Sequence, residues 1–207
     1  MEIAFDRWIV AEAPLAASPA LPNPCLEPGS DEALMGHFQR GDEAAFRHLY
    51  DRYRSPLLRF VQRLVPDAGE SEEVAQETWM AVIRGRERYS PRARFVTYLF
   101  SIAHRRAMDR WRKRGRWPET QLNAADEIPG SCIHEPEWRS QNQALGAALL
   151  AAISALPLLQ REAFLLRAEA GLGIEEIARV TGTNLETAKS RLRYALRRLR
   201  ASLESWK

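Results

Sequence analysis

The chain has 207 residues, of which 45% are hydrophobic and 28% charged, and its formal net charge is +3. This length suits one ordinary domain or two small ones, and the composition is that of a globular protein. No apolar run approaches the roughly 20 residues that span a bilayer, the N-terminus lacks the basic start of an export signal, and two cysteines are too few for a disulfide framework. We therefore expect a cytoplasmic protein that does not insert into a membrane.

The N-terminal part predicts a tail followed by short amphipathic helices. Residues 1–29 contain five prolines among Ala and Ser and carry a net charge of −3, which is typical of a disordered tail. Ser30 is a suitable N-cap for a first helix, which Gly41 is expected to close. A second helical stretch follows. We expect Pro56 to break it or to start a new helix, and Pro66 to end it.

The next two predicted helices differ in charge. Residues 71–84 have apolar or small side chains at helical spacing on one side. A loop over residues 85–94 leads into a long helix from residue 95 to about residue 114. Its last part, residues 104–116, holds seven Arg or Lys against one Asp, a net charge of +6. Such a block is either a solvated helix face or a contact point for a polyanion.

A change of composition separates the two halves of the chain. Residues 117–142 contain three prolines and carry about −4, which predicts a linker, and helical patterns resume at residue 143. Cys132 and His134 lie in this linker without a partner at metal-ligand spacing, so we expect no metal. No segment alternates as a strand would. The predicted fold is all-α, with two small helical domains (residues 30–116 and 143–207) joined by a flexible linker.

Residues 173–191 have the pattern of a helix-turn-helix. In the first helix Ile177 is apolar and Ala178 is small, which allows a second helix to cross closely, and Gly182 occupies the turn, where a positive φ is favoured. Thr183 and Glu186 form a T-x-x-E capping box for the second helix.

The second helix divides into an apolar side and a basic side. The predicted core stripe comprises Leu185, Ala188, Leu192, Leu196, Leu199 and Leu203. The outward face comprises Thr187, Ser190, Arg191, Tyr194, Arg197 and Arg198, while Lys189, Arg193 and Arg200 flank the stripe. This layout is typical of a helix that lies in a DNA major groove, although a coiled-coil seam is the alternative.

The C-terminal sequence resembles region 4 of the extracytoplasmic-function (ECF) sigma factors. The resemblance is carried by "ALPLLQREAFLLRAEAGLGIEEIARVTG", "ETAKS" and "RLRYALRRLR". It implies binding of the promoter −35 element by Thr187, Lys189, Ser190, Arg191, Tyr194, Arg197 and Arg198.

The first half resembles region 2 of the same family. "SEEVAQETWMAVIR" resembles the helix that binds core RNA polymerase, which implies roles for Glu73, Gln76, Glu77 and Trp79. "ARFVTYLFSIAHRRAMDRWRKRGR" resembles the −10 helix. The implied −10 residues are Arg94, His104, Arg105, Met108, Arg112, Lys113 and Arg114. His104, Met108 and Trp111 plot on the outer face of this helix, where they would stack on bases or, alternatively, pack under a neighbouring helix.

The expected function is therefore transcription initiation without catalysis or a cofactor. The resemblance implies core RNA polymerase and promoter DNA as partners, together with an anti-sigma protein. The alternative is a stand-alone LuxR-like helix-turn-helix regulator, which would need neither the "QETW" helix nor the basic block at residues 104–116. Phosphate-binding glycine loops of the type found in nucleotide-dependent enzymes are missing.

Overall fold

The computed structural model describes residues 29–115 and 141–203. Within these residues it contains helices and no strand, which confirms the all-α prediction. The helices are α2 (Asp31–Gln39), α3 (Glu43–Leu64), α4 (Ala68–Arg84), η1 (Arg86–Arg88), α5 (Phe95–Lys113), α6 (Gln141–Ser154), α7 (Leu158–Ala170), α8 (Ile174–Thr181) and α9 (Leu185–Leu203). None of these described helices is long and apolar enough to cross a membrane.

Some predictions concern residues outside the described ranges. These are the tail, of which only Gly29 is described, and the linker, of which only the first two residues of α6 are described. Cys25, Cys132 and His134 also lie outside the described residues.

Local capping fixes the first helix as the sequence indicates. The Ser30 hydroxyl accepts a hydrogen bond from the backbone N–H of Ala33 at 3.2 Å, so Ser30 is the N-cap of α2. Gly41 follows the helix with φ at 97°, a conformation that favours glycine. Both predictions for this helix are confirmed.

Helix α3 runs through Pro56 without a break, so the predicted interruption there is wrong. A proline inside a helix removes one backbone hydrogen bond and costs about 3 kcal/mol. Leu49, Leu57 and Phe60 are fully buried on the inner side of this one helix. Burial of each such side chain stabilises the fold by about 1.5–3 kcal/mol. Together they outweigh the cost of the proline. Helix α3 ends at Leu64, two residues before Pro66, as expected.

A carboxylate from α2 caps the N-terminus of α5. Arg94, the N-cap residue, makes no capping hydrogen bond with its own side chain. Instead the backbone N–H of Phe95 donates to Glu32 Oε1 at 2.7 Å. A negative charge at this end also complements the helix dipole. The contact orients α5 relative to α2 across 63 residues of sequence.

We expect Glu32→Ala to lower the free energy of unfolding by about 1–2 kcal/mol, because it removes a cap and a favourable dipole interaction. Chemical denaturation monitored by circular dichroism measures this loss. Glu72→Ala is the matched control, since Glu72 is exposed on α4 and its removal should change stability by less than about 0.5 kcal/mol. Equal stability of the two variants would contradict the capping role.

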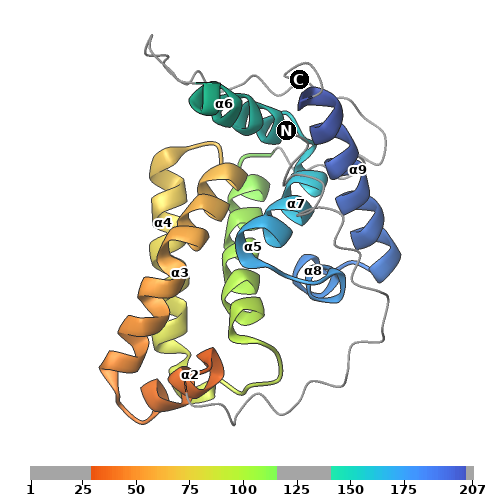
Figure 1. The fold of residues 1–207 in the computed structure, drawn as a ribbon. Coiled ribbons are helices and arrows are strands. Elements are labelled where there is room, and N and C mark those ends of the chain that lie inside the picture. The colour runs from red at the N-terminus through yellow and green to blue at the C-terminus, as the bar shows by residue number, and fades with distance from the viewer. Residues whose placement is uncertain (1–28, 116–140, 204–207) are drawn as a thin grey trace.

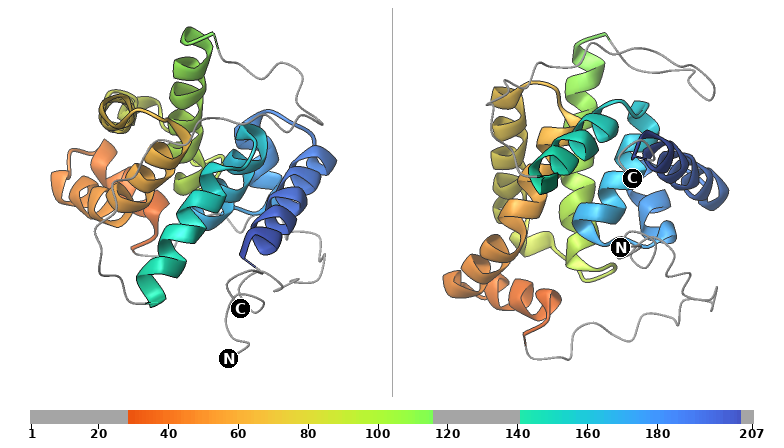
Figure 2. Two further views of the ribbon diagram at one scale, coloured as in Figure 1. Left: turned by 90° about the horizontal axis from the view of Figure 1, so that it is seen from above. Right: turned by 45° about the horizontal axis from the view of Figure 1, so that its top comes forward.

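The helices form two units that pack against each other. The N-terminal unit comprises α2 to α5, and the C-terminal unit comprises α6 to α9 (Figure 1). Helix α7 contacts α3 and α5 as well as α9, and α8 contacts α5 (Figure 2). The buried side chains of both units therefore form one continuous core among the described residues. The sequence predicted the two units but not this packing.

Candidate nucleic-acid interface

The predicted helix-turn-helix is formed by α8 and α9. Gly182 has φ 66° and ψ 32°, the left-handed conformation expected for the turn. Ile177 and Ala178 are buried, at 1% and 7% exposure, where α8 crosses α9. These observations confirm the turn and the crossing predicted from the sequence.

The N-cap of α9 is Asn184 and not Thr183, so the predicted capping box is wrong. The backbone N–H of Thr187 donates to Asn184 Oδ1 at 2.7 Å, and α9 begins at Leu185. The Thr183 hydroxyl lies 3.0 Å from the Thr181 hydroxyl instead. Asn and Thr both cap well, and the turn after Gly182 is one residue longer than the motif assumed.

The apolar stripe of α9 is buried along most of its length. Ala188, Leu192 and Leu199 are at most 8% exposed, and Leu196 is partly buried. Ala195 is also fully buried. Leu185, which was placed in the stripe, is 45% exposed because it begins the helix at the edge of the unit.

Opposite this stripe, α9 presents a cationic face to solvent. Lys189, Arg193, Arg197 and Arg198 are exposed. The Tyr194 ring is also exposed, and the guanidinium groups of Arg193 and Arg197 lie over it, 5.4 and 5.1 Å from its centroid. Thr187 and Ser190 are half-buried in the first turns, and Ser190 donates to the Thr187 carbonyl. The sequence placed Lys189 and Arg193 beside the stripe, and because both are exposed they belong to the face.

Arg191 differs from the other cations of α9, because it is held by a carboxylate of α7. Its guanidinium lies 3.2 Å from Glu162 Oε1, and its side chain is 19% exposed. Glu162 is 2% exposed and its other oxygen lies 3.0 Å from His104 Nε2. The sequence placed Arg191 on the outward face. The structure places its side chain at the edge of that face, directed toward α7.

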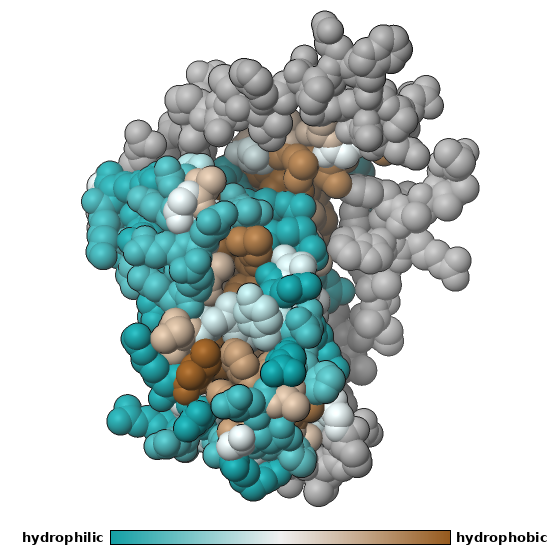
Figure 3. All heavy atoms as spheres, turned by 90° about the vertical axis from the view of Figure 1, so that its left-hand side faces the viewer, coloured by the Kyte–Doolittle hydropathy of each residue, from teal (hydrophilic) through white to brown (hydrophobic). Residues whose placement is uncertain are grey.

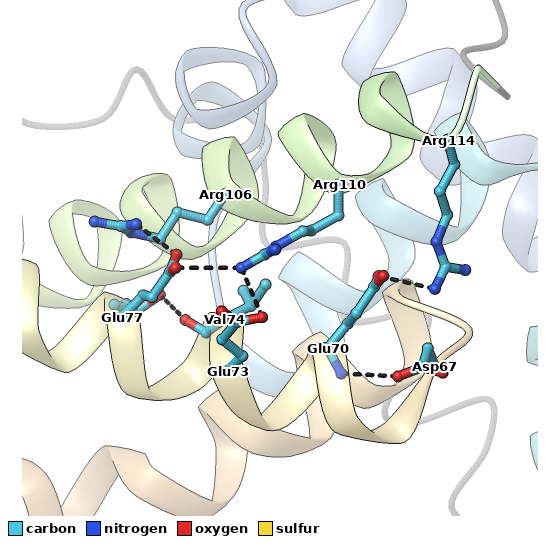
Figure 4. Close-up of polar contacts among 9 residues, drawn as sticks. Asp67, Glu70, Glu73, Val74, Glu77, Arg106, Arg110 and Arg114 are labelled. Carbon is cyan, nitrogen blue, oxygen red and sulfur yellow. Dashed lines mark hydrogen bonds and ion pairs between the residues drawn. The ribbon is translucent and has the colours of Figure 1, made fainter.

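Three of the six described cations in the basic block of α5 pair with acidic side chains of α4 (Figure 4). Arg106 lies 2.7 Å from Glu77, Arg110 lies 3.2 Å from Glu77 and 3.0 Å from Glu73, and Arg114 lies 2.9 Å from Glu70. We call this set of pairs the α4–α5 ladder. The residue numbers of each pair sum to nearly the same value, as expected for two antiparallel helices. The Glu spacing on α4 and the Arg spacing on α5 were visible in the sequence, and this signal was missed.

Three residues predicted on the outer face of α5 are buried, so that placement is wrong. His104, Met108 and Trp111 are 8%, 2% and 4% exposed. Helices α7 and α8 pack on α5, and His104 contacts Glu162 of α7. The Trp111 indole N–H donates to the Leu64 carbonyl at 3.0 Å. The alternative, packing under a neighbouring helix, is what the structure shows.

The remaining predicted −10 residues lie on the surface, in different environments. Arg105 and Lys113 are exposed on α5 and form no ion pair with any described residue. Arg112 pairs with Asp109 at 2.6 Å on the same helix. Arg94 lies 3.4 Å from Glu176 of α8. The cations of α5 with no acidic neighbour are thus fewer than the sequence suggested.

The predicted polymerase-binding residues of α4 lie in three different environments. Gln76 is exposed, whereas Trp79 is 7% exposed and packs against Phe46 and Tyr50, with ring centroids 5.8 and 5.0 Å apart. Glu73 and Glu77 face α5 in the ladder. Met80 and Tyr50 are the exposed large hydrophobic residues described in the N-terminal unit. Figure 3 shows the face of the molecule on the left of Figure 1, where a few hydrophobic side chains interrupt a hydrophilic surface.

Comparison with known proteins agrees with both halves. The family model for Sigma-70 region 2 matches residues 49–116, and that for Sigma-70 region 4 matches residues 146–199. The curated relatives include the ECF RNA polymerase sigma factor SigK of Mycobacterium tuberculosis, which is 34% identical over 182 residues, 84% of this chain and 93% of SigK. The chain belongs to the ECF sigma factors. SigK of Mycobacterium ulcerans is 33% identical over the same shares of the two chains.

Solved structures share the fold of this ECF sigma factor. The sigma factor RpoE of Bartonella quintana, solved with the anti-sigma factor NepR, is 26% identical, with a TM-score of 0.61 over 77% of this chain and 96% of RpoE. CnrH, solved with the cytosolic domain of CnrY, matches with a TM-score of 0.61 at 20% identity over 84% of this chain and 97% of CnrH. The region 2 match favours a sigma factor over the LuxR-like alternative, since that alternative accounts only for the C-terminal half.

Proposed function

We propose that this ECF sigma factor carries core RNA polymerase to specific promoters, reading the −35 element as duplex and capturing the melted −10 strand. The observation that carries the proposal is the exposed cationic face of α9, directly after a well-formed helix-turn-helix turn. The match of the N-terminal unit to Sigma-70 region 2 supports the contact with the melted −10 strand. The protein would act where the polymerase acts, in the cytoplasm.

At the −35 element, α9 is suited to the major groove. In helix-turn-helix proteins the N-terminal residues of the second helix meet base edges and later residues contact the backbone. Thr187, Lys189 and Ser190 occupy the first turns, and Arg197 and Arg198 follow two turns later. The ion pair with Glu162 fixes the direction of Arg191 toward the edge of this surface. We assign base contacts to Thr187 and Ser190, and phosphate contacts to the exposed cations Lys189, Arg193, Arg197 and Arg198.

At the −10 element, the exposed cations Arg105 and Lys113 are the proposed backbone contacts, with Arg94 at the start of α5. A melted strand is held by a cationic groove and by stacking of its bases. His104 and Met108 are buried, so we leave them out of this contact. The α4–α5 ladder holds α5 rigidly under the strand, because its ion pairs join the two helices at three successive levels.

For the polymerase, we propose the outer face of α4 with Gln76 and Met80 as contacts. The buried ring of Trp79 supports this face from below. Exposed hydrophobic side chains ringed by polar ones are typical of protein interfaces. An anti-sigma protein is a further proposed partner, because the solved RpoE neighbour is a complex with one.

The overall proposal is tested by transcription from a random promoter library with bacterial core RNA polymerase. We expect discrete start sites only when this protein is added. Failure to bind the polymerase, or initiation without sequence preference, would overturn the proposal.

A double variant tests the −10 contact separately. Arg105→Ala with Lys113→Ala should weaken binding of the unwound promoter strand and lower the slope of its log–log salt dependence by about 0.7 for each lost phosphate contact. Fluorescence anisotropy with a single-stranded promoter oligonucleotide measures both. Arg40→Ala with Arg47→Ala, two exposed positions of the N-terminal unit, is the charge-matched control. An unchanged slope in the first variant would remove these two residues from the strand contact.

A further inference from the structure

Three glutamates of the C-terminal unit contact the N-terminal unit. Glu162 and Glu169 lie on α7 and Glu176 lies on α8, at intervals of seven residues. Glu162 contacts His104, and Glu169 contacts Arg59 and Arg63. Glu176 contacts Arg94 and Thr97. We call these glutamates the acidic row. The row brings carboxylates onto the face of the N-terminal unit formed by α3 and α5.

Glu169 is held by two cations of α3. Its Oε2 lies 2.8 Å from Arg59 Nε, and its Oε1 pairs with Arg63. The Glu169 side chain is only 6% exposed, although it lies near the end of α7. Contact with the N-terminal unit is therefore what removes this carboxylate from water.

Glu176 contacts the start of α5. The Thr97 hydroxyl donates to Glu176 Oε1 at 2.5 Å, and Arg94 lies 3.4 Å from Oε2. Arg94 is one of the proposed −10 contacts. In this arrangement a carboxylate occupies a position beside Arg94 that a phosphate of the unwound strand would need.

With the two units packed together, the protein is too small to contact both promoter elements at once. Positions −35 and −10 are separated by 25 base pairs, which is about 85 Å of duplex. A compact body of the described size has a radius of gyration of about 15 Å and hence a diameter of about 40 Å. Helices α5 and α9 belong to one such body, joined through α7 and α8. If the proposed function holds, the two units must separate before both elements are read.

The chemistry of the interface suits a reversible contact. Burying an ion pair costs desolvation free energy, which the attraction between the two charges offsets only approximately. When the charges separate, each regains its hydration. The acidic row contributes carboxylates, and the opposing face contributes arginines that would bind phosphates equally well. Polyanion and acidic row therefore compete for the same groups.

We propose that the structure is a closed state, in which the acidic row docks on the Arg59, Arg63 and Arg94 face of the N-terminal unit and is displaced by the unwound DNA strand. This inference rests on the proposed function for the identity of the competitor. The closed state itself rests only on the contacts described above.

Charge reversal at Glu169 tests the closed state in the full chain. Glu169→Arg places a third cation beside Arg59 and Arg63, and we expect the radius of gyration in small-angle X-ray scattering to rise. Binding of a single-stranded promoter oligonucleotide should tighten about tenfold if nine in ten native molecules are closed. Glu175→Arg is the matched control, because Glu175 is exposed on α8 and the change in net charge is the same.

A charge swap separates a lost contact from a folding defect. Adding Arg59→Glu and Arg63→Glu to Glu169→Arg restores opposite charges, and we expect the native radius of gyration to return. An unchanged radius in Glu169→Arg, or a swap that stays expanded, would overturn the acidic row as the lock. Expansion without tighter strand binding, relative to Glu175→Arg, would overturn the competition. If no variant bound DNA at all, the proposed function would fail, while the scattering result would still decide the closed state.

Discussion

Replacing Lys189, Arg193, Arg197 and Arg198 together with alanine should lower the affinity for the −35 duplex about a thousandfold at 0.15 M salt. Each phosphate neutralised on B-DNA adds about −0.9 to the slope of log affinity against log salt, so four contacts account for about −3.6. All four side chains are exposed on α9, and none forms an ion pair with a described residue. Alanine favours helix, so the fold should be retained. Fluorescence anisotropy over a range of salt concentrations, with a promoter duplex selected from the random library, measures both the affinity and the slope of its salt dependence.

The control for this experiment removes four arginines elsewhere. Arg40, Arg47, Arg54 and Arg84 are exposed on the N-terminal unit, and their replacement by alanine changes the net charge equally. In this control only long-range electrostatic attraction to the duplex should change, and salt screens such attraction beyond roughly 10 Å. A salt slope that falls as much in the control as in the α9 variant would show that net charge, and not the α9 face, binds the duplex.

The features that were predicted correctly from the sequence are those that depend on residues close together in the chain. The cap at Ser30, the turn at Gly182 and most of the α9 stripe are set by side chains within a few positions, and these predictions were confirmed. Asn184 shows the limit of such reasoning, because two adjacent capping residues differ only in which one the turn places at the helix start.

Features that depend on distant residues were not predicted. Pro56 is tolerated because α3 is held by the packing of residues on both sides of it. His104 is buried because Glu162, 58 residues away, approaches it from the other unit. The helical pattern of α5 shows which side chains share a face, but not which helix covers that face.

The charge of α5 illustrates the same limit for the candidate site. Counting arginines at residues 104–116 suggested a strongly cationic surface. The α4–α5 ladder neutralises Arg106 and Arg110 with Glu73 and Glu77, which the sequence assigned to polymerase binding, and it neutralises Arg114 with Glu70. A charge count becomes a surface potential only after the pairs are known, and in this unit the pairs join two helices to which the sequence assigned different functions.

Trp79→Ala should destabilise the N-terminal unit by about 3–5 kcal/mol, the usual cost of removing a buried aromatic ring. Trp79 is 7% exposed and contacts the rings of Phe46 and Tyr50. For a unit of this size the loss corresponds to a fall in Tm of more than about 12 °C. Thermal unfolding monitored by circular dichroism measures it. Loss of polymerase binding by this variant would follow from unfolding, and so would not by itself assign Trp79 to the interface.

Met80 and Gln76 provide the variant that separates stability from binding. Both are exposed on the same helix, Met80 at 43%, so Gln76→Ala with Met80→Ala should change the free energy of unfolding by no more than about 1 kcal/mol. If the outer face of α4 binds the polymerase, this double variant loses affinity for core enzyme at an unchanged Tm. If instead it binds as tightly as the native protein, the polymerase contact lies elsewhere, and the rings around Trp79 serve only to hold α3 and α4 together.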